Sequence, residues 1–263
     1  MSEATLPSPA PAPNDASEDV IVRFVDVHKS FGKQHVLRGV SFDVPRGGVL
    51  GIMGGSGTGK SVTLRHVIGL LQPDSGRVEV EGRNVPDLKP RELGELRKRM
   101  GYVFQEAALI NWLTVAENLA LPLSENTSLS RAEIADQVAE KLEMVHVPEA
   151  GAKLPSEISG GMKKRVGLAR ALITEPDIIL YDEPNAGLDP EISRSINDLM
   201  REIADTHDST ALVVEHRIEC IRTVCDEVVF LDGGKALVHL PTDEFLRPTL
   251  PRLVEFLGPD ALN

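Results

Sequence analysis

The stretch from Gly54 to Ser61 constrains the fold of this chain more than any other segment. A short apolar run, Val49 to Met53, precedes it, and a helical pattern from Lys60 to Leu71 follows. Glycines let a backbone wrap closely around a phosphate with its amides pointing inward, and the following helix adds the positive end of its dipole. The sequence therefore predicts a phosphate-binding loop made of Gly54, Gly55, Ser56, Gly57, Thr58, Gly59, Lys60 and Ser61.

A second apolar run, Ile178 to Tyr181, ends on the carboxylate pair Asp182 and Glu183. In open parallel sheets, ligands bind at the carboxyl ends of the strands. A carboxylate pair after a strand is by itself often a turn and a helix cap. Together with the phosphate-binding loop it predicts a site for ATP and Mg²⁺, in which Ser61 and Asp182 hold the metal and Glu183 polarises the attacking water. In that site Lys60 reaches the β- and γ-phosphates.

Short apolar runs alternate with helical patterns along the chain, which predicts an α/β core around a parallel sheet. Gly233-Gly234 between two apolar runs indicates a closing hairpin. Three further stretches near the N-terminus have strand character: Val20 to Val27, Leu37 to Val44, and Arg77 to Val80. The remaining core strands are expected at Met100 to Phe104, Asp177 to Tyr181, Ala211 to Val214 and Val228 to Leu231.

The middle of the chain, about residues 105–172, has an almost wholly helical pattern. Thr114 with Glu117, and Ser130 with Glu133, each fit a capping box, in which a hydroxyl and a carboxylate satisfy the free amides at a helix start. We expect this block to be a helical subdomain inserted into the α/β core.

Composition limits the partners of this chain. Its net charge of −12 argues against a general affinity for nucleic acid, and the basic clusters 97–99 and 163–165 are expected to be solvated helix faces. No apolar run approaches the roughly 20 residues of a membrane-spanning helix, and no secretory signal is evident, so a cytoplasmic location is expected. The Pro- and Ala-rich residues 1–19 are expected to form a disordered tail. The two cysteines, Cys220 and Cys225, are both expected to be inert, with one or both packed in the core.

Five consecutive residues, Ile158-Ser159-Gly160-Gly161-Met162, resemble the LSGGQ signature of the ATP-binding subunits of ABC transporters. Other marks of that family occur in the expected order: Gln105 after a strand, Gly187-Leu188-Asp189-Pro190, and His216 after the strand 211–215. The resemblance covers about residues 20–240. It implies an ABC ATPase domain of the P-loop NTPase fold, with a parallel-sheet core, an N-terminal antiparallel β-subdomain and the inserted helical subdomain, followed by a C-terminal extension over 241–263.

The resemblance also implies roles for individual residues. In this family the chain forms a homodimer that sandwiches two ATP molecules, and each signature faces the γ-phosphate of ATP held by the other subunit. His216 contacts the γ-phosphate, and Gln105 senses Mg²⁺ and the attacking water. Phe31 either stacks on adenine or simply packs. The signature and D-loop residues that approach the nucleotide are Ser159, Gly160, Gly161, Met162 and Asp189.

The sequence departs from the common family pattern at several positions. Ile158 and Met162 replace leucine and glutamine, which leaves the serine and glycines of the signature in place. Glu215 and Arg217 flank the histidine, where Thr or Ser and then Asp are commoner, so the switch geometry is an open question.

Val62 after the phosphate-binding loop, Met162, Ala107-Ala108-Leu109 and the segment 114–127 resemble the ATPase subunits of the Mce/Mla-type bacterial lipid transporters. That family is implied to move phospholipid or another hydrophobic substrate between membranes, with separate permease subunits and an Mce-type substrate-binding protein. The ATPase is then peripheral on the cytoplasmic face of the inner membrane, and residues 107–113 with Trp112 are the candidate permease contact. The alternative is that Trp112 packs into the helical insert.

Other functions stay open at this level. The chain can be the ATPase of an importer for a small polar solute, a soluble ABC ATPase without a permease, or a nucleotide-binding regulator without turnover. The apolar residues of the C-terminal extension can dock on their own domain or on a partner subunit; they are Phe245, Leu250, Leu253, Phe256 and Leu257.

Overall fold

The computed structural model describes residues 20–258, which fold into two parts. The first part takes residues 20–46, 50–88 and 226–258 from the described range, and the second takes 47–49 and 89–225. The tail predicted over residues 1–19 lies outside the described residues.

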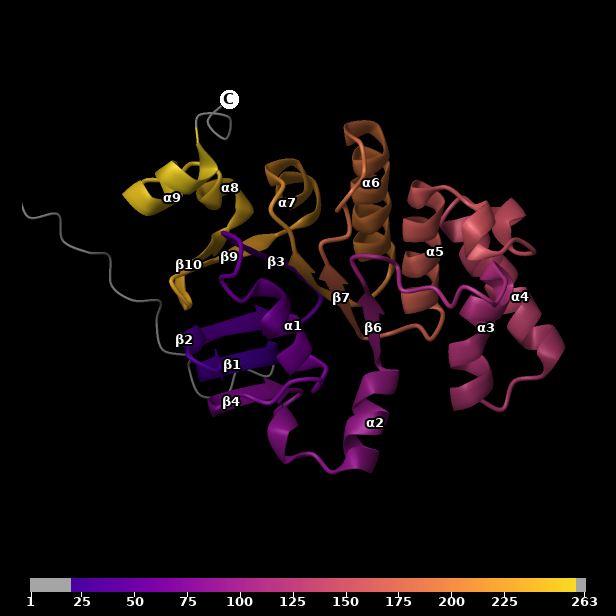
Figure 1. Ribbon diagram of the computed structural model, residues 1–263, viewed down its shortest axis with the longest axis horizontal. Coiled ribbons are helices and arrows are strands. Elements are labelled where there is room, and N and C mark those ends of the chain that lie inside the picture. The colour runs from indigo at the N-terminus through magenta and orange to yellow at the C-terminus, as the bar shows by residue number, and fades with distance from the viewer. Residues whose placement is uncertain (1–19, 259–263) are drawn as a thin grey trace, which may run out of the picture. The chain divides into compact units, whose positions relative to one another are not determined.

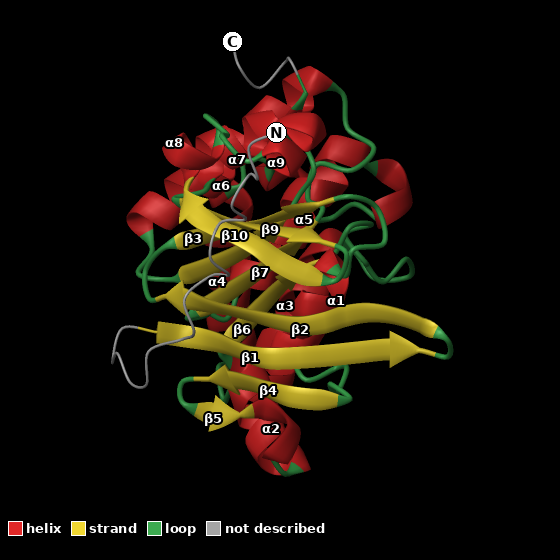
Figure 2. Ribbon diagram, turned by 90° about the vertical axis from the view of Figure 1, so that its left-hand side faces the viewer, coloured by secondary structure: helices red, strands yellow, loops and turns green. Residues whose placement is uncertain are grey.

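The first part contains an antiparallel sheet of the order β2-β1-β4-β5 (Figure 2). Phe24 on β1 faces Phe42 on β2, and their rings stack with centroids 4.5 Å apart. The inward side chains of β2 from Val40 onward alternate with more exposed ones, as the sequence pattern predicts for a half-buried strand. The four strands are β1 (Val20–Phe31), β2 (Gln34–Pro45), β4 (Ser75–Val80) and β5 (Arg83–Asn84).

The same part holds the strand that feeds the phosphate-binding loop, β3 (Val49–Gly54), which is buried throughout. It pairs in parallel with β9 (Glu227–Asp232), which forms the predicted hairpin with β10 (Lys235–Pro241). The helix α1 (Lys60–Val67) is shorter than the predicted 60–71, because Gly69 turns into the left-handed region with φ of 67°.

The C-terminal helices α8 (Thr242–Phe245) and α9 (Pro251–Leu257) pack on their own part of the chain. Phe245, Leu253 and Leu257 are buried, and the ring of Phe256 lies 4.7 Å from that of Phe230 on β9. Docking on its own domain is therefore the arrangement that the extension has.

Three parallel strands form the sheet of the second part, in the order β8-β7-β6. They are β6 (Met100–Val103), β7 (Ile178–Asp182) and β8 (Thr210–Val214), and all are buried, as continuous apolar runs predict. The part also contains α6 (Pro190–Thr206), α7 (Ile218–Val224) and α2 (Pro90–Lys98). For α2, the sequence indicated only a basic helix face at 97–99 and not the bounds of the helix. The parallel core and the N-terminal antiparallel sheet confirm the predicted fold class.

Three helices of the second part lie side by side: α3 (Val115–Asn126), α4 (Arg131–Met144) and α5 (Gly160–Leu172) (Figure 1). Both capping boxes are present, since the Thr114 and Ser130 hydroxyls accept from the amides of Glu117 and Glu133. The prediction of an almost wholly helical block over 105–172 was wrong at two places. Residues 104–114 form turns and loop, and residues 145–159 hold two short 3₁₀ turns, Pro148–Ala150 and Pro155–Glu157.

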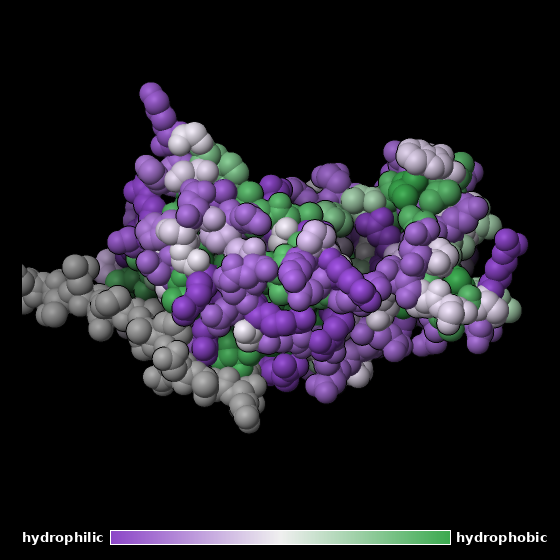
Figure 3. All heavy atoms as spheres, turned by 90° about the horizontal axis from the view of Figure 1, so that it is seen from below, coloured by the Kyte–Doolittle hydropathy of each residue, from purple (hydrophilic) through white to green (hydrophobic). Residues whose placement is uncertain are grey.

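Hydrophilic residues cover most of the face drawn in Figure 3, with hydrophobic ones in small areas between them. Among residues 20–258, no helix is long and apolar enough to cross a membrane. Cys220 and Cys225 are buried, as predicted. The expectation of a solvated helix face was wrong for residues 163–165, because Lys164 is buried and Arg165 donates to the carbonyl of Val145.

Candidate nucleotide site

The phosphate-binding loop follows β3 in the first part, and its backbone needs glycine at several points. Gly54, Gly57 and Gly59 have φ of 154°, 76° and 101°. A Cβ on Gly54 would lie 2.3 Å from the carbonyl oxygen of Leu231, and one on Gly59 would lie 2.4 Å from a methyl of Leu37. The loop therefore packs so tightly against neighbouring residues that only glycine fits at positions 54 and 59.

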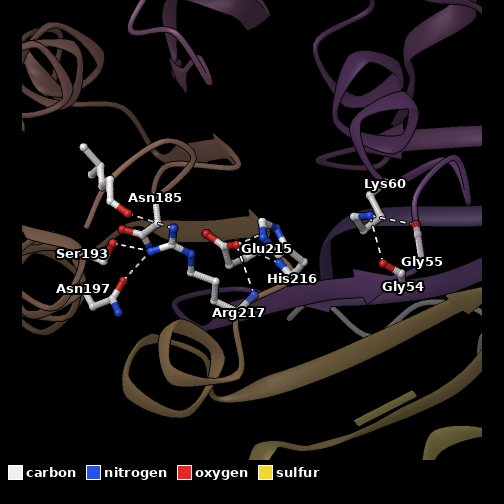
Figure 4. A network of polar contacts seen from close by, with 10 residues as sticks. Gly54, Gly55, Lys60, Asn185, Ser193, Asn197, Glu215, His216 and Arg217 are labelled. Atoms are coloured by element: carbon white, nitrogen blue, oxygen red, sulfur yellow. Dashed lines mark hydrogen bonds and ion pairs between the residues drawn. The ribbon is translucent and has the colours of Figure 1, made fainter. Parts of the chain in front are cut away.

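Lys60 is curled into this loop (Figure 4). Its side chain is buried, and Nζ donates to the carbonyl oxygens of Gly54 and Gly55 at 3.0 and 2.9 Å. The helix α1 begins directly at Lys60, and its N-cap Gly59 offers no side-chain acceptor to the first-turn amides. No acidic residue stands in that turn. A glycine-bounded loop, a lysine and an uncapped helix start together fit a polyphosphate.

The carboxylate pair lies at the carboxyl end of β7 in the second part. Asp182 is buried, and the hydroxyl of Tyr102 on β6 donates to its Oδ2 at 2.9 Å. Glu183 has a left-handed backbone, with φ of 48°, and its amide donates to the carbonyl of Val214 at the end of β8. Strained backbone of this kind persists where the surroundings over-determine it, often at functional sites. Tyr102 has no motif of its own, and the sequence analysis missed it.

Gln105 follows the next strand of the same sheet. It lies two residues after β6 rather than at the strand end, and it is exposed. Its carbonyl accepts from the ammonium of Lys164, which is 9% exposed on α5. Burial lowers the pKa of Lys164, while the nearby carboxylates of Glu106, Glu215 and Glu183 oppose that shift.

The loop after Gln105 is also held by α5. The guanidinium of Arg170 donates to the carbonyls of Ala108 and Ala107 at 2.6 and 2.8 Å. Both alanines have positive φ, 57° at Ala107 and 48° at Ala108. A Cβ on Gly167 would lie 3.0 Å from that of Ala107, so α5 approaches the loop closely. Trp112 further along is 81% exposed, so the alternative that it packs into the helical insert was wrong.

His216 follows β8, between two charged residues. Glu215 is fully buried, and one of its oxygens lies 3.1 Å from Nδ1 of the His216 ring. The Arg217 guanidinium donates to the Ser193 hydroxyl and, at 3.0 Å, to the carbonyl of Leu188 (Figure 4). The structure thus brings Gln105, the carboxylate pair and His216 to the ends of three neighbouring strands, because Val103 pairs with Tyr181 and Asp182 with Val214.

The signature residues occupy a different place, the start of α5. Ser159 is the N-cap, and its hydroxyl accepts from the amide of Met162 at 3.2 Å. Gly160 is exposed with open space at its Cβ position, whereas a Cβ on Gly161 would lie 3.0 Å from Ile192 of α6. The predicted serine-capped helix start is therefore present.

Two further predicted residues lie at element ends. Asp189 is the N-cap of α6, where its side chain accepts from the amide of Ile192 at 3.0 Å. Phe31 ends β1 in the first part and is 48% exposed, with the ammonium of Lys29 5.7 Å from its ring centre. An exposed ring favours the stacking role over simple packing.

Known proteins are similar to this chain over most of its length. The sequence profile of the ABC transporter family matches residues 37–186. A chloroplastic protein of Arabidopsis thaliana named TRIGALACTOSYLDIACYLGLYCEROL 3 is 41% identical over 255 residues, which cover 90% of this chain and 73% of that protein. A "Probable ribonucleotide transport ATP-binding protein mkl" of Mycobacterium leprae is 39% identical, covering 91% and 69%. The methionine import ATP-binding protein MetN of Mesorhizobium japonicum is 41% identical, covering 90% and 64%.

Solved structures agree with this match. The ATP-binding cassette MJ0796, as a dimer bound to ADP and Pi, superposes with a TM-score of 0.78 at 31% identity, covering 84% of this chain and 99% of that one. The protein cbiO1 from Clostridium perfringens, part of the ABC transporter complex cbiONQ, superposes with the same TM-score of 0.78 at 28% identity, covering 91% of this chain and 99% of that one.

Fold and site define the class of this protein: it is an α/β ATPase of the P-loop type with the ABC cassette fold. The chain belongs to the ABC transporter family, of which it is an ATP-binding protein whose ATP hydrolysis is coupled to transport.

Proposed function

We propose that the chain hydrolyses ATP with Glu183 as the general base. The observation that carries this proposal is the convergence of Gln105, Asp182, Glu183 and His216 at the ends of β6, β7 and β8. Glu183 stands one residue beyond the buried Asp182 and has a left-handed backbone. One carboxylate is then available for the metal and the other for the attacking water.

ATP phosphates bind to the amides of Gly54–Lys60 and to the ammonium of Lys60, which exchanges its two loop carbonyls for phosphate oxygens. The donor set that would hold Mg²⁺ consists of the Ser61 hydroxyl, the Asp182 carboxylate and the Gln105 side chain, all hard oxygen ligands of the kind that Mg²⁺ prefers. Held there, the metal would supply positive charge next to the phosphates. Tyr102 orients Asp182 through its hydroxyl, and His216 contacts the γ-phosphate.

The active unit in this proposal is a homodimer. Ser159, Gly160, Gly161 and Met162 open α5 without an acidic residue in its first turn, so they suit an anion, and the ATP on a second copy supplies one. Asp189 caps the start of α6, which lies against the start of α5 where Gly161 approaches Ile192. Dimeric structures of MJ0796 support this arrangement.

We further propose an ATPase domain over 20–240 with the helical subdomain at about 105–172, and an extension over 241–263. Separate permease subunits supply the membrane path, so the chain works from the cytoplasmic face of the membrane. The loop from Ala107 to Leu113 contacts the permease, with the exposed Trp112 as its most prominent apolar side chain.

The transported substrate is proposed to be a phospholipid or another hydrophobic molecule, with an Mce-type binding protein as an additional partner. Val62, Met162 and the segments 107–109 and 114–127 resemble the Mce/Mla ATPases. The relative named for trigalactosyldiacylglycerol, a lipid, supports the same substrate class. A small polar solute is the second candidate, since other relatives are named for methionine import and ribonucleotide transport.

Replacement of Glu183 by glutamine tests the catalytic part. We expect Glu183→Gln to lower steady-state ATP hydrolysis by at least about 100-fold while ATP binding persists, because the base is lost and the phosphate contacts are kept. Glu191→Gln, an exposed carboxylate on α6, is the matched control and should hydrolyse ATP like the native chain. Unchanged hydrolysis in Glu183→Gln would contradict the proposed base.

The substrate class is tested on the complex purified from native membranes. We expect a permease to co-purify and ATP hydrolysis in reconstituted vesicles to rise when phospholipid acceptor vesicles are added. Stimulation by methionine or a ribonucleotide instead, with none by lipid, would favour the polar-solute reading. Recovery of the chain without any membrane protein would exclude transport by this complex.

A further inference from the structure

Glu215 holds an unusual position beside His216. It directly follows the buried apolar strand β8, and its side chain is fully buried. Its Oε1 accepts from the backbone amides of His216 and Arg217 at 2.8 and 3.2 Å. The same oxygen lies 3.1 Å from Nδ1 of the His216 ring, whose side chain is about half-exposed (Figure 4).

This proximity favours one of the two positions for hydrogen on a neutral His216 ring. A carboxylate oxygen is an acceptor, so at 3.1 Å it stabilises a ring that carries hydrogen on Nδ1 and repels the lone pair of a bare Nδ1. Nε2, on the far side of the ring, is then the nitrogen left to meet a ligand. A carboxylate behind an imidazole sets tautomer and ring orientation in this way in catalytic triads and around metal-bound histidines.

Stability alone does not account for a buried carboxylate here. Burying an ionised group is unfavourable unless partners compensate, and Oε2 of Glu215 has no hydrogen-bond partner among the described residues. The charged and titratable groups around it are His216 and Arg217 on its own segment, Lys164 on α5 and Cys220 on α7. The two cations offset the negative charge, but an oxygen without a donor is left inside the protein.

Arg217 holds the same segment from the other side. Its guanidinium donates to the Ser193 hydroxyl on α6 and to the carbonyl of Leu188, which precedes the helix cap Asp189. His216 thus lies between two residues that are each tied to the interior, and only its ring projects outward.

We propose that Glu215 is a positioning residue for ATP hydrolysis: through the contact between Oε1 and Nδ1 it holds the His216 ring in the Nδ1–H tautomer, with Nε2 directed to the γ-phosphate. The proposal rests on the proposed role of His216 at that phosphate. Glu215 itself touches no nucleotide and acts through the histidine.

The tautomer can be measured on the native full-length chain. Labelling with [¹⁵N]histidine and long-range ¹H–¹⁵N correlation spectra, at a pH where the ring is neutral, distinguish the two tautomers, and the signal missing in His216→Ala assigns the residue. We expect the Nδ1–H form in the native chain and a mixture or the Nε2–H form in Glu215→Ser. An Nε2–H ring in the native chain would overturn the proposal without reference to any variant's folding.

Kinetics supply the second readout. We expect Glu215→Ala to lower kcat by about tenfold or more with KM for MgATP changed less than about twofold, because a second residue behind a functional histidine typically contributes one to two orders of magnitude. Glu215→Gln keeps an acceptor oxygen for Nδ1 and should retain most of kcat. Glu219→Gln, an exposed carboxylate on α7, is the control for loss of a nearby charge.

Different results would refute the role of His216 and the role of Glu215. If His216→Ala hydrolyses ATP like the native chain, the role of His216 is wrong. If His216→Ala is inactive while Glu215→Ala keeps the native kcat, the histidine role stands and the positioning role of Glu215 is refuted. A double variant no slower than His216→Ala supports the proposal, since both residues then act through one contact.

Discussion

Two helix starts in this chain are expected to bind phosphate, and they are built differently. The helix α1 begins after Gly59, whose φ is 101° and which provides no side-chain cap. The helix α5 begins after Ser159, whose hydroxyl caps the amide of Met162. Neither helix has an acidic residue in its first turn. Both starts can therefore attract an anion through the helix dipole, but only α5 satisfies one of its own first amides.

This difference in construction indicates different roles for the start of α1 and the start of α5. The loop before α1 is a shape that only glycines allow, and its lysine donates to Gly54 and Gly55 in place of phosphate oxygens. It is a preformed cradle for a ligand. The start of α5 is an ordinary serine-capped helix start, which in the proposed dimer offers its remaining donors to a second copy. Damage to the first should abolish nucleotide binding, and damage to the second should spare binding and affect assembly.

Gly59→Ala is expected to have the largest effect. The methyl group of the new alanine would lie 2.4 Å from Leu37, and the fold would hold that alanine at a positive φ that L-residues rarely adopt. We therefore expect the free energy of unfolding to fall by at least about 2 kcal/mol. ATP affinity should fall more than about 100-fold, as measured by calorimetry, because the loop amides are displaced. Gly47→Ala has a similar φ of 75° and open space, so it should show only a backbone penalty of about 1 kcal/mol and native ATP binding. Equal effects of the two variants would contradict the cradle.

Ser159→Ala comes next. Loss of the cap should lower the free energy of unfolding by about 1 kcal/mol. ATP binding to the single chain should stay within about twofold, since the P-loop is untouched, while ATP-driven dimerisation in a Glu183→Gln background falls by about tenfold. Size-exclusion chromatography with and without MgATP measures the second effect. A drop in ATP affinity of the isolated chain would show that Ser159 belongs to the site of its own subunit.

The P-loop could be predicted from the sequence almost completely, because its function lies in backbone shape and glycine spacing reports that shape directly. The carboxylate pair was predicted for a similar reason, since Ile178 to Tyr181 is a continuous apolar run that delivers Asp182 to a strand end. Capping boxes predicted the starts of α3 and α4 correctly because both partners lie within one turn. Local sequence patterns thus predicted most of the fold.

Contacts between distant segments could not be predicted. Tyr102 reaches Asp182 across 80 positions of the chain, and Lys164 reaches the carbonyl of Gln105 across 59. The sequence pattern of residues 163–165 is that of a solvated basic cluster, and only packing against the loop shows that Lys164 is buried. Glu215 is a further example, because a carboxylate beside a histidine gives no sign of its burial in the sequence.

Arg170→Ala tests whether α5, apart from its start, holds the loop after Gln105 in place. Arg170 holds the carbonyls of Ala107 and Ala108, so we expect amide hydrogen exchange over residues 105–113 to rise at least about tenfold when these charge-assisted hydrogen bonds are lost. ATP binding at the P-loop should be unaffected, and stimulation of hydrolysis by the membrane complex should fall. Arg222→Ala, an exposed arginine on α7, serves as the control. Unchanged exchange in Arg170→Ala would show that the loop holds its shape without α5.

Gly160→Ala is expected to have the smallest effect on stability, and the effect is a gain. Position 160 has open space for a Cβ and lies in the first turn of α5, where alanine is a better helix former than glycine. Thermal unfolding should therefore show a free energy of unfolding that is higher by a few tenths to about 1 kcal/mol.

The fold does not need glycine at position 160, so any need for glycine there comes from the ligand. If a phosphate on a second copy approaches this backbone, the added methyl should weaken ATP-driven dimerisation in the Glu183→Gln background even as the monomer becomes more stable. Unweakened dimerisation would mean that the phosphate does not come close to Gly160, and the two helix starts would then differ in function as well as in construction.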